Sequence, residues 1–80
     1  MLQTEISTSA SELGKWIDDY SKTLLDRAYY LLSDKEDAKD VVQEVFFSAY
    51  KSRDSFQEKS SPLTWLTSIL HHKIADIYKK

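Results

Sequence analysis

The chain has 80 residues, of which 41% are hydrophobic and 30% are charged, so it can form one small domain around a single core. With one glycine and one proline, it lacks the turn residues that a many-stranded fold requires. The absence of cysteine excludes disulfides and cysteine-based zinc sites, and it fits a reducing cytoplasm. No apolar run is long enough to span a membrane, and "MLQTEISTSASE" has no signal-peptide pattern.

The formal net charge of −2 conceals an uneven distribution of charged residues. Residues 1–44 have a charge balance of −5, whereas residues 45–80 have a balance of +3. A chain with an acidic first part and a basic second part can meet two partners of opposite charge. Two ordinary solvated surfaces explain the same distribution and are the interpretation that charge alone favours.

Residues 10–32 are predicted to form a first helix, which follows a polar N-terminal tail at residues 1–8. The stretch "SASE" has the pattern of a capping box, in which Ser9 is the N-cap and the side chain of Glu12 reaches back. Apolar residues then recur at helical spacing. They are Leu13, Trp16, Ile17, Tyr20, Leu24, Ala28, Leu31 and Leu32.

The stretch "SDKED" predicts a break, followed by a second helix over residues 35–52. Either Ser33 with Glu36 or Asp34 with Asp37 can cap this helix, and acidic residues suit the positive end of its dipole. One face of the helix is apolar and is predicted to enter the core. It consists of Ala38, Val41, Val42, Val45, Phe46 and Ala49.

A third helix is predicted over residues 62–80, because Ser61 provides an N-cap and Pro62 suits the first helical position. Its apolar arc is expected to hold Leu63, Leu66, Leu70, Ile74 and Ile77, with Trp65, Ile69 and Tyr78 at the margins. Lys73 falls inside this arc, and no local pattern explains a cation there. Nothing stops the last helix at "IYKK", so we expect the chain to be a piece of a longer protein.

Phe47 lies on the polar side of the second helix, among Asp40, Gln43, Glu44 and Lys51. A rotation of about 100° per residue places these side chains opposite the apolar face. An aromatic anchor with a polar rim is typical of a protein-binding surface. Alternatively, another helix of the domain packs on Phe47.

Two stretches, "DKEDAKDVVQEVFFSAYKSRDSF" and "SPLTWLTSILHHKIADIYKK", resemble region 2 of bacterial sigma factors, especially the extracytoplasmic-function group. The first follows the family pattern D-x-E-D-A-x-D-h-h-Q-E-V-F-h-x-A-W, where h is an apolar residue. Tyr50 stands at the position of the final tryptophan. The second matches the W-L-x-x-I helix of the family at Trp65, Leu66 and Ile69. The resemblance implies an all-α, three-helix domain over residues 9–80, without the helix-turn-helix domain that reads the minus-thirty-five element.

The resemblance implies a role in transcription initiation. In the family, the D-x-x-Q-E face docks on the clamp coiled coil of the largest subunit of core RNA polymerase. This face corresponds to Asp40, Gln43 and Glu44 here, with Phe47 beside them. The carboxylates are expected to pair with arginine residues while Phe47 fills an apolar notch.

The third helix and the loop before it are implied to help melt and read the minus-ten promoter element. This task requires donors for phosphate and an exposed rim for a base flipped from the non-template single strand of promoter DNA. The available side chains are Lys51, Arg53, Phe56, Lys59, Ser60, Ser61, Ser68, His71, His72 and Lys79. The family often has arginine in place of Ser68 and asparagine in place of His72, so the promoter sequence does not follow from the resemblance.

Two side chains among these stretches also have a purely structural interpretation. Trp65 is flanked by Leu66 and Ile69 at helical spacing, which favours a place in the core over base stacking. Phe56 is the one aromatic residue of a polar connection and is expected to anchor that loop.

The alternative function is a sigma-like decoy, which binds an anti-sigma factor without DNA activity. Lys51, Arg53 and Lys59 argue against the decoy, whereas the departures at Ser68 and His72 favour it. An anti-sigma factor is an expected partner in either case. The predicted location is the cytoplasm, and no membrane partner is expected.

No catalytic activity is predicted, because no cysteine nucleophile, phosphate-binding glycine loop or matched Ser-His-acid set is apparent. His72 and Asp76 lie four residues apart, but two ligands do not make a metal site. The sequence therefore predicts neither an enzyme nor a metal or other cofactor.

Overall fold

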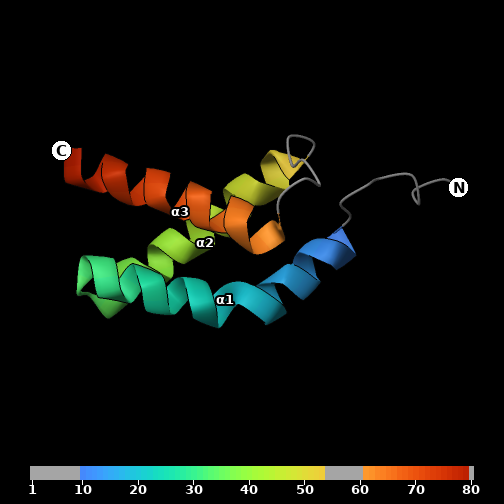
Figure 1. Ribbon diagram of the computed structural model, residues 1–80, viewed down its shortest axis with the longest axis horizontal. Helices are drawn as coiled ribbons and strands as arrows, with labels where there is room; N and C mark the ends of the chain where they lie inside the picture. The colour runs from blue at the N-terminus through green and yellow to red at the C-terminus, as the bar shows by residue number, and fades with distance from the viewer. Residues whose placement is uncertain (1–9, 54–60, 80) are drawn as a thin grey trace, which may run out of the picture.

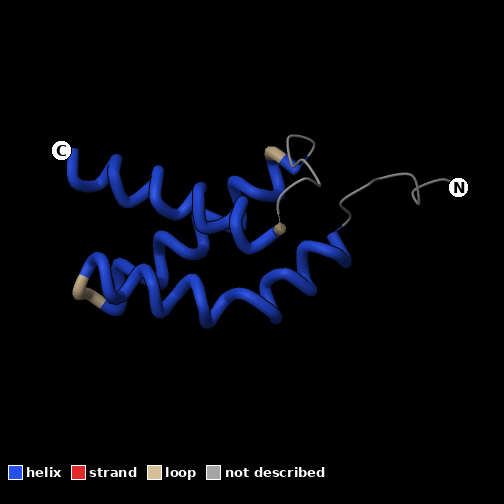
Figure 2. The backbone as a smooth tube through the Cα atoms, in the orientation of Figure 1, coloured by secondary structure: helices blue, strands red, loops and turns tan. Residues whose placement is uncertain are grey.

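The computed structural model describes residues 10–53 and 61–79, and three helices account for nearly all of them (Figure 1). They are α1 (Ala10–Leu32), α2 (Lys35–Lys51) and α3 (Pro62–Lys79). Within the described ranges no residue is in a strand (Figure 2), so the predicted all-α class is confirmed. None of these helices combines the length and the apolar composition needed to cross a membrane.

The connection between α1 and α2 is made by Ser33 and Asp34. Ser33 has a φ of 59°, and its N–H donates to the carbonyl of Tyr29 at 2.8 Å, as in a left-handed C-terminal cap. Asp34 is the N-cap of α2, and its carboxylate accepts from the N–H of Asp37 at 2.9 Å. Of the two predicted capping pairs, the structure therefore has Asp34 with Asp37. Ser33 instead terminates α1.

The start of α3 is stabilised by Ser61. The side-chain oxygen of Ser61 accepts from the N–H of Thr64 at 3.1 Å, and its carbonyl accepts from the N–H of Trp65 at 3.1 Å. The predicted N-cap is therefore confirmed. The other predicted N-cap, Ser9, lies outside the described residues.

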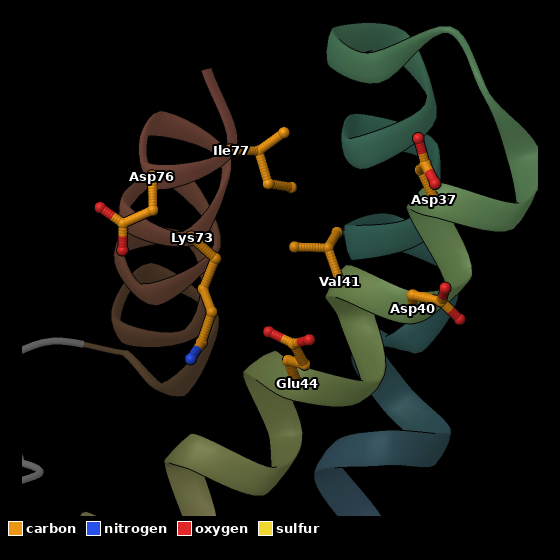
Figure 3. A pocket seen from close by; sticks show the side chains of 7 residues that line it. All are labelled: Asp37, Asp40, Val41, Glu44, Lys73, Asp76 and Ile77. Carbon is orange, nitrogen blue, oxygen red and sulfur yellow. The ribbon is translucent and has the colours of Figure 1, made fainter. Parts of the chain in front are cut away.

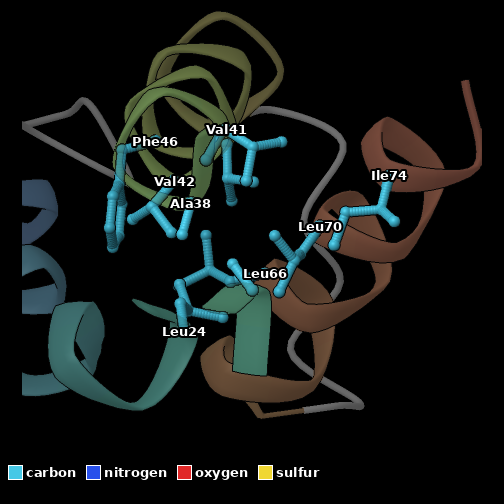
Figure 4. Packing of buried hydrophobic residues seen from close by; sticks show 11 residues of the cluster. Leu24, Ala38, Val41, Val42, Phe46, Leu66, Leu70 and Ile74 are labelled. Carbon is cyan, nitrogen blue, oxygen red and sulfur yellow. The ribbon is translucent and has the colours of Figure 1, made fainter. Parts of the chain in front are cut away.

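The core lies where the three helices meet (Figure 4). The predicted apolar face of α2 is confirmed, since all six of its residues are buried. Its partners are two residues of α1 and three of α3. They are Leu24, Ala28, Leu66, Leu70 and Ile74.

Two residues of the predicted apolar faces lie outside this core. Ile17 is 39% exposed and Ile77 is 44% exposed. Ile77 lines a hollow between α2 and α3, which leaves its side chain open to solvent.

Aromatic side chains join α1 to α3 around the core. The rings of Trp16 and Trp65 meet edge to face, with centroids 6.2 Å apart and an interplanar angle of 75°, a favourable arrangement for two aromatic rings. Trp65 is half-buried and packs against the core, as predicted. Tyr78, predicted at the margin of the α3 arc, is exposed, but its hydroxyl contacts the end of α1.

Candidate protein and nucleic-acid interfaces

The side of α2 opposite the core presents the four side chains predicted to contact polymerase. Asp40, Gln43, Glu44 and Phe47 together line a shallow hollow of about 420 Å³, and we call this surface the outer face of α2. The ring of Phe47 is 63% exposed. The alternative that another helix packs on Phe47 is wrong within the described part of the chain.

Lys51 lies one helical turn beyond Phe47 on the same side of α2. Its Nζ is 4.9 Å from the centroid of the Phe47 ring, within the range of a cation–π contact. Carboxylates on one side and an ammonium on the other thus border the exposed aromatic ring. This surface can bury an apolar group and pair with cations at once.

Arg53 lies just beyond the end of α2 and is anchored there. Its Nη1 donates to the carbonyl of Tyr50 at 2.7 Å, and its guanidinium carbon is 4.3 Å from the centroid of the Tyr50 ring. Lys51 and Arg53, both predicted to bind DNA, are therefore brought to the same end of α2. The remaining guanidinium donors of Arg53 are available for phosphate.

The predicted DNA-binding residues of α3 fall on two sides of that helix. His72 lines a hollow of about 340 Å³ between α3 and the end of α2, whose other lining residues are Ser48, Ser52, Trp65, Ile69, Lys73 and Asp76. Ser68 and Lys79 are exposed and share the side of His72 at helical spacing. His71 is also exposed, but it points about 100° away from His72.

The remaining predicted DNA contacts precede α3. Ser61 is exposed, but its side-chain oxygen is within 2.9 Å of the Thr64 hydroxyl and accepts from the Thr64 N–H, so the cap already uses this group. Phe56, Lys59 and Ser60 lie outside the described residues. The predicted role of Phe56 as a loop anchor therefore concerns a residue outside the described part of the chain.

A further hollow, of about 370 Å³, lies between α2 and α3 (Figure 3). Carboxylates and one ammonium surround it, and Val41 and Ile77 add apolar surface. The charged lining residues are Asp37, Asp40, Glu44, Lys73 and Asp76. Among the described residues, no group of three or more histidine or acidic side chains is placed to hold a metal ion.

Sequence reasoning did not identify Asp37, Lys73 and Asp76 as neighbours of the predicted polymerase-binding residues. The signal that could have found this hollow was Lys73, a cation inside an apolar arc. A half-buried lysine requires a polar environment for its ammonium, and the hollow that Lys73 lines is also lined by the acidic residues of α2.

Comparison with known proteins gives a family match and two curated relatives. Residues 16–80 match the family model described as Sigma-70 region 2. The protein named ECF RNA polymerase sigma factor SigX, from Bacillus subtilis (strain 168), is 35% identical over 63 residues, which are 79% of this chain and 32% of that protein. A probable RNA polymerase sigma factor from Haemophilus influenzae is 42% identical over 43 residues, 54% of this chain and 22% of that protein.

The chain thus spans about a third or less of the length of these curated relatives. No solved structure matches it.

Proposed function

Because the chain belongs to the sigma-70 region 2 family, we propose that it is the region 2 domain of an extracytoplasmic-function-type RNA polymerase sigma factor. In this function it docks on the clamp coiled coil of core RNA polymerase and helps melt and read the minus-ten element of a promoter. The observation that carries the proposal is the outer face of α2, where an exposed aromatic ring lies among carboxylates. Since RNA polymerase is its partner, the domain acts in the cytoplasm.

Polymerase docking is supported by the contrast between the two sides of α2. The inner side is buried in the core, whereas the Phe47 ring is 63% exposed, so most of its surface remains for burial against a partner. Interface energy concentrates in such aromatic anchors. Asp40 and Glu44 beside it favour a basic partner, because carboxylates and arginine form strong charge-assisted hydrogen bonds.

Reading of single-stranded DNA is supported by the hollow at the end of α2. Its lining combines an aromatic ring, an aliphatic side chain and polar donors, from Trp65, Ile69 and His72. An unstacked base requires an apolar surface and hydrogen-bonding groups at its edge. Lys51, Arg53 and Lys79 supply positive charge for phosphates at the end of α2 and along α3.

The second candidate is the decoy that sequesters an anti-sigma factor, and it is favoured by Ser68 and His72, which depart from the family pattern. A decoy would retain the outer face of α2 without binding DNA. An anti-sigma factor is also a proposed regulator of an active sigma domain. Single-stranded DNA affinity that falls steeply with salt distinguishes the two, because phosphate contacts release counterions.

The decisive experiment is a titration of this chain with the isolated clamp coiled coil, beside a Glu44→Arg variant. Loss of one side of a desolvated charge pair is expected to weaken binding by roughly 2–5 kcal/mol. Asp18→Arg, an equal charge change at an exposed position of α1, is the matched control and should retain binding. Failure of the unsubstituted chain to bind would contradict docking and favour the decoy.

A further inference from the structure

Trp65 borders both the core and the hollow at the end of α2. It packs against the buried cluster, and it also lines that hollow together with Ile69 and His72. The residue is half-buried, so part of the indole remains open to a ligand in the hollow. An indole is the largest aromatic surface that a side chain can offer to an unstacked base.

Trp16 of α1 supports Trp65 from the side of the core. The two ring centroids are 6.2 Å apart and the ring planes are inclined by 75°, an edge-to-face contact of the kind that stabilises aromatic pairs. Trp16 is also half-buried and packed against the core. It is not among the described residues that line the hollow, so an effect of Trp16 on the hollow must pass through the ring of Trp65.

The contact with Trp16 limits the freedom of the Trp65 ring. A large side chain at the edge of a core, beside a hollow of about 340 Å³, has space to adopt another rotamer. The ring of Trp16 fills the space behind the indole, where a smaller side chain would leave a gap. A side chain that is ordered before binding adds no ordering cost to the binding step.

We propose that Trp16 is a positioning residue for the hollow at the end of α2, an inference that rests on the function proposed above. Through the edge-to-face contact, Trp16 holds the Trp65 indole in the orientation that stacks on an unpaired base of single-stranded DNA. Trp16 itself does not contact the DNA. The inference adds α1 to the elements that determine the DNA affinity of the domain.

The test measures binding of a labelled single-stranded oligonucleotide of about 16 nucleotides by fluorescence anisotropy. Trp16→Leu and Trp16→Met both keep an apolar side chain and remove the ring. We expect each to lower the affinity about three- to tenfold, the effect of ordering one side chain on binding. Trp16→Phe keeps an aromatic ring and should retain most of the affinity. Tyr29→Leu, the matched control, removes a ring of α1 that lines the hollow between α1 and α2, and it should leave the affinity unchanged.

Fluorescence gives a second readout. The chain has two tryptophans, so in each Trp16 variant the emission comes from Trp65 alone. Without the neighbouring ring, in Trp16→Leu, this emission should shift to longer wavelength as the indole turns toward solvent, relative to Trp16→Phe. The bound oligonucleotide should quench the emission of Trp16→Phe, because a stacked base contacts the indole. Circular dichroism confirms that each variant is folded.

The outcomes separate this inference from the proposed function. The inference alone would be overturned if the ring-free variants bind the oligonucleotide as tightly as the unsubstituted chain, or if Trp16→Phe or Tyr29→Leu loses as much affinity as they do. Emission of Trp65 that neither shifts nor is quenched would overturn it as well. Failure of the unsubstituted chain to bind the oligonucleotide would overturn the proposed reading of DNA and this inference with it.

Discussion

The hydroxyl of Tyr78 donates a 2.6 Å hydrogen bond to the carbonyl oxygen of Leu31, so the last turn of α3 is tied to the last turn of α1. The carbonyls of a final helical turn have no partner within their own helix. Tyr78 supplies a donor for one of them from a residue 47 positions away. The bond therefore helps to fix the end of α3, the helix that carries the proposed DNA contacts.

Replacement of Tyr78 by phenylalanine removes this hydrogen bond and keeps the ring. Because the Tyr78 side chain is largely exposed, water can replace the lost donor, and we expect a loss of only about 0.5–1 kcal/mol in unfolding free energy. Urea denaturation measures this value. Tyr30→Phe is the control, since Tyr30 is 80% exposed, and equal losses in both variants would show that the bond contributes nothing.

Replacement of Ser33 by glycine should stabilise the domain. Ser33 has a left-handed backbone with a φ of 59°, a conformation that costs a residue with a Cβ roughly 1–2 kcal/mol. Glycine avoids this cost but makes the unfolded chain more flexible. We therefore expect a net gain of about 0.5–1 kcal/mol in the free energy of unfolding. Thermal denaturation of Ser33→Gly, beside Ser33→Val and the unsubstituted chain, tests this. A melting temperature of Ser33→Gly that is equal to or lower than that of the unsubstituted chain would contradict the prediction.

Leu70 and Ile77 both belong to the predicted apolar arc of α3, but they should differ strongly in their contribution to stability. Leu70 is fully buried, so Leu70→Ala leaves a cavity and should cost roughly 2–5 kcal/mol. Ile77 is 44% exposed beside the hollow between α2 and α3, so Ile77→Ala should cost clearly less, about 1 kcal/mol. Chemical denaturation of both variants measures the difference, and similar losses would show that Ile77 belongs to the core.

The positions of the helices could be predicted from the sequence because their signals are local. Ser61 before Pro62 marks the start of α3, and the period of Val41, Val45 and Ala49 marks the buried side of α2. Each of these features depends on side chains within a turn or two. The structure confirms them to within one residue at the described helix ends.

The spaces between helices could not be predicted in this way. A helical wheel placed Ile77 in the apolar arc, but the separation of α2 and α3 leaves it beside a hollow. The same separation gives Lys73 a polar environment. Both depend on how two helices cross, which the pattern within one helix does not specify. The limits of the domain and the residues that bind polymerase and DNA stay predictions.

The adjacent residues Phe46 and Phe47 provide the sharpest test of the outer face of α2. Phe46 is buried in the core and Phe47 is exposed, so Phe46→Ala should cost roughly 3–5 kcal/mol of stability. Phe47→Ala should change stability by about 0.5 kcal/mol or less, since it removes a surface side chain and its contact with Lys51. In binding to the clamp coiled coil, however, Phe47→Ala should lose about 2 kcal/mol or more, as an interface anchor does.

Denaturation curves and titration calorimetry on the same two variants separate these effects. A folded Phe47→Ala variant that binds the coiled coil as tightly as the unsubstituted chain would exclude this ring from the interface. Docking would then depend on the carboxylates of Asp40 and Glu44, and it should weaken strongly as salt rises, because exposed charge pairs are screened. The salt dependence of the Phe47→Ala complex therefore shows whether burial of the ring or charge attraction holds the two proteins together.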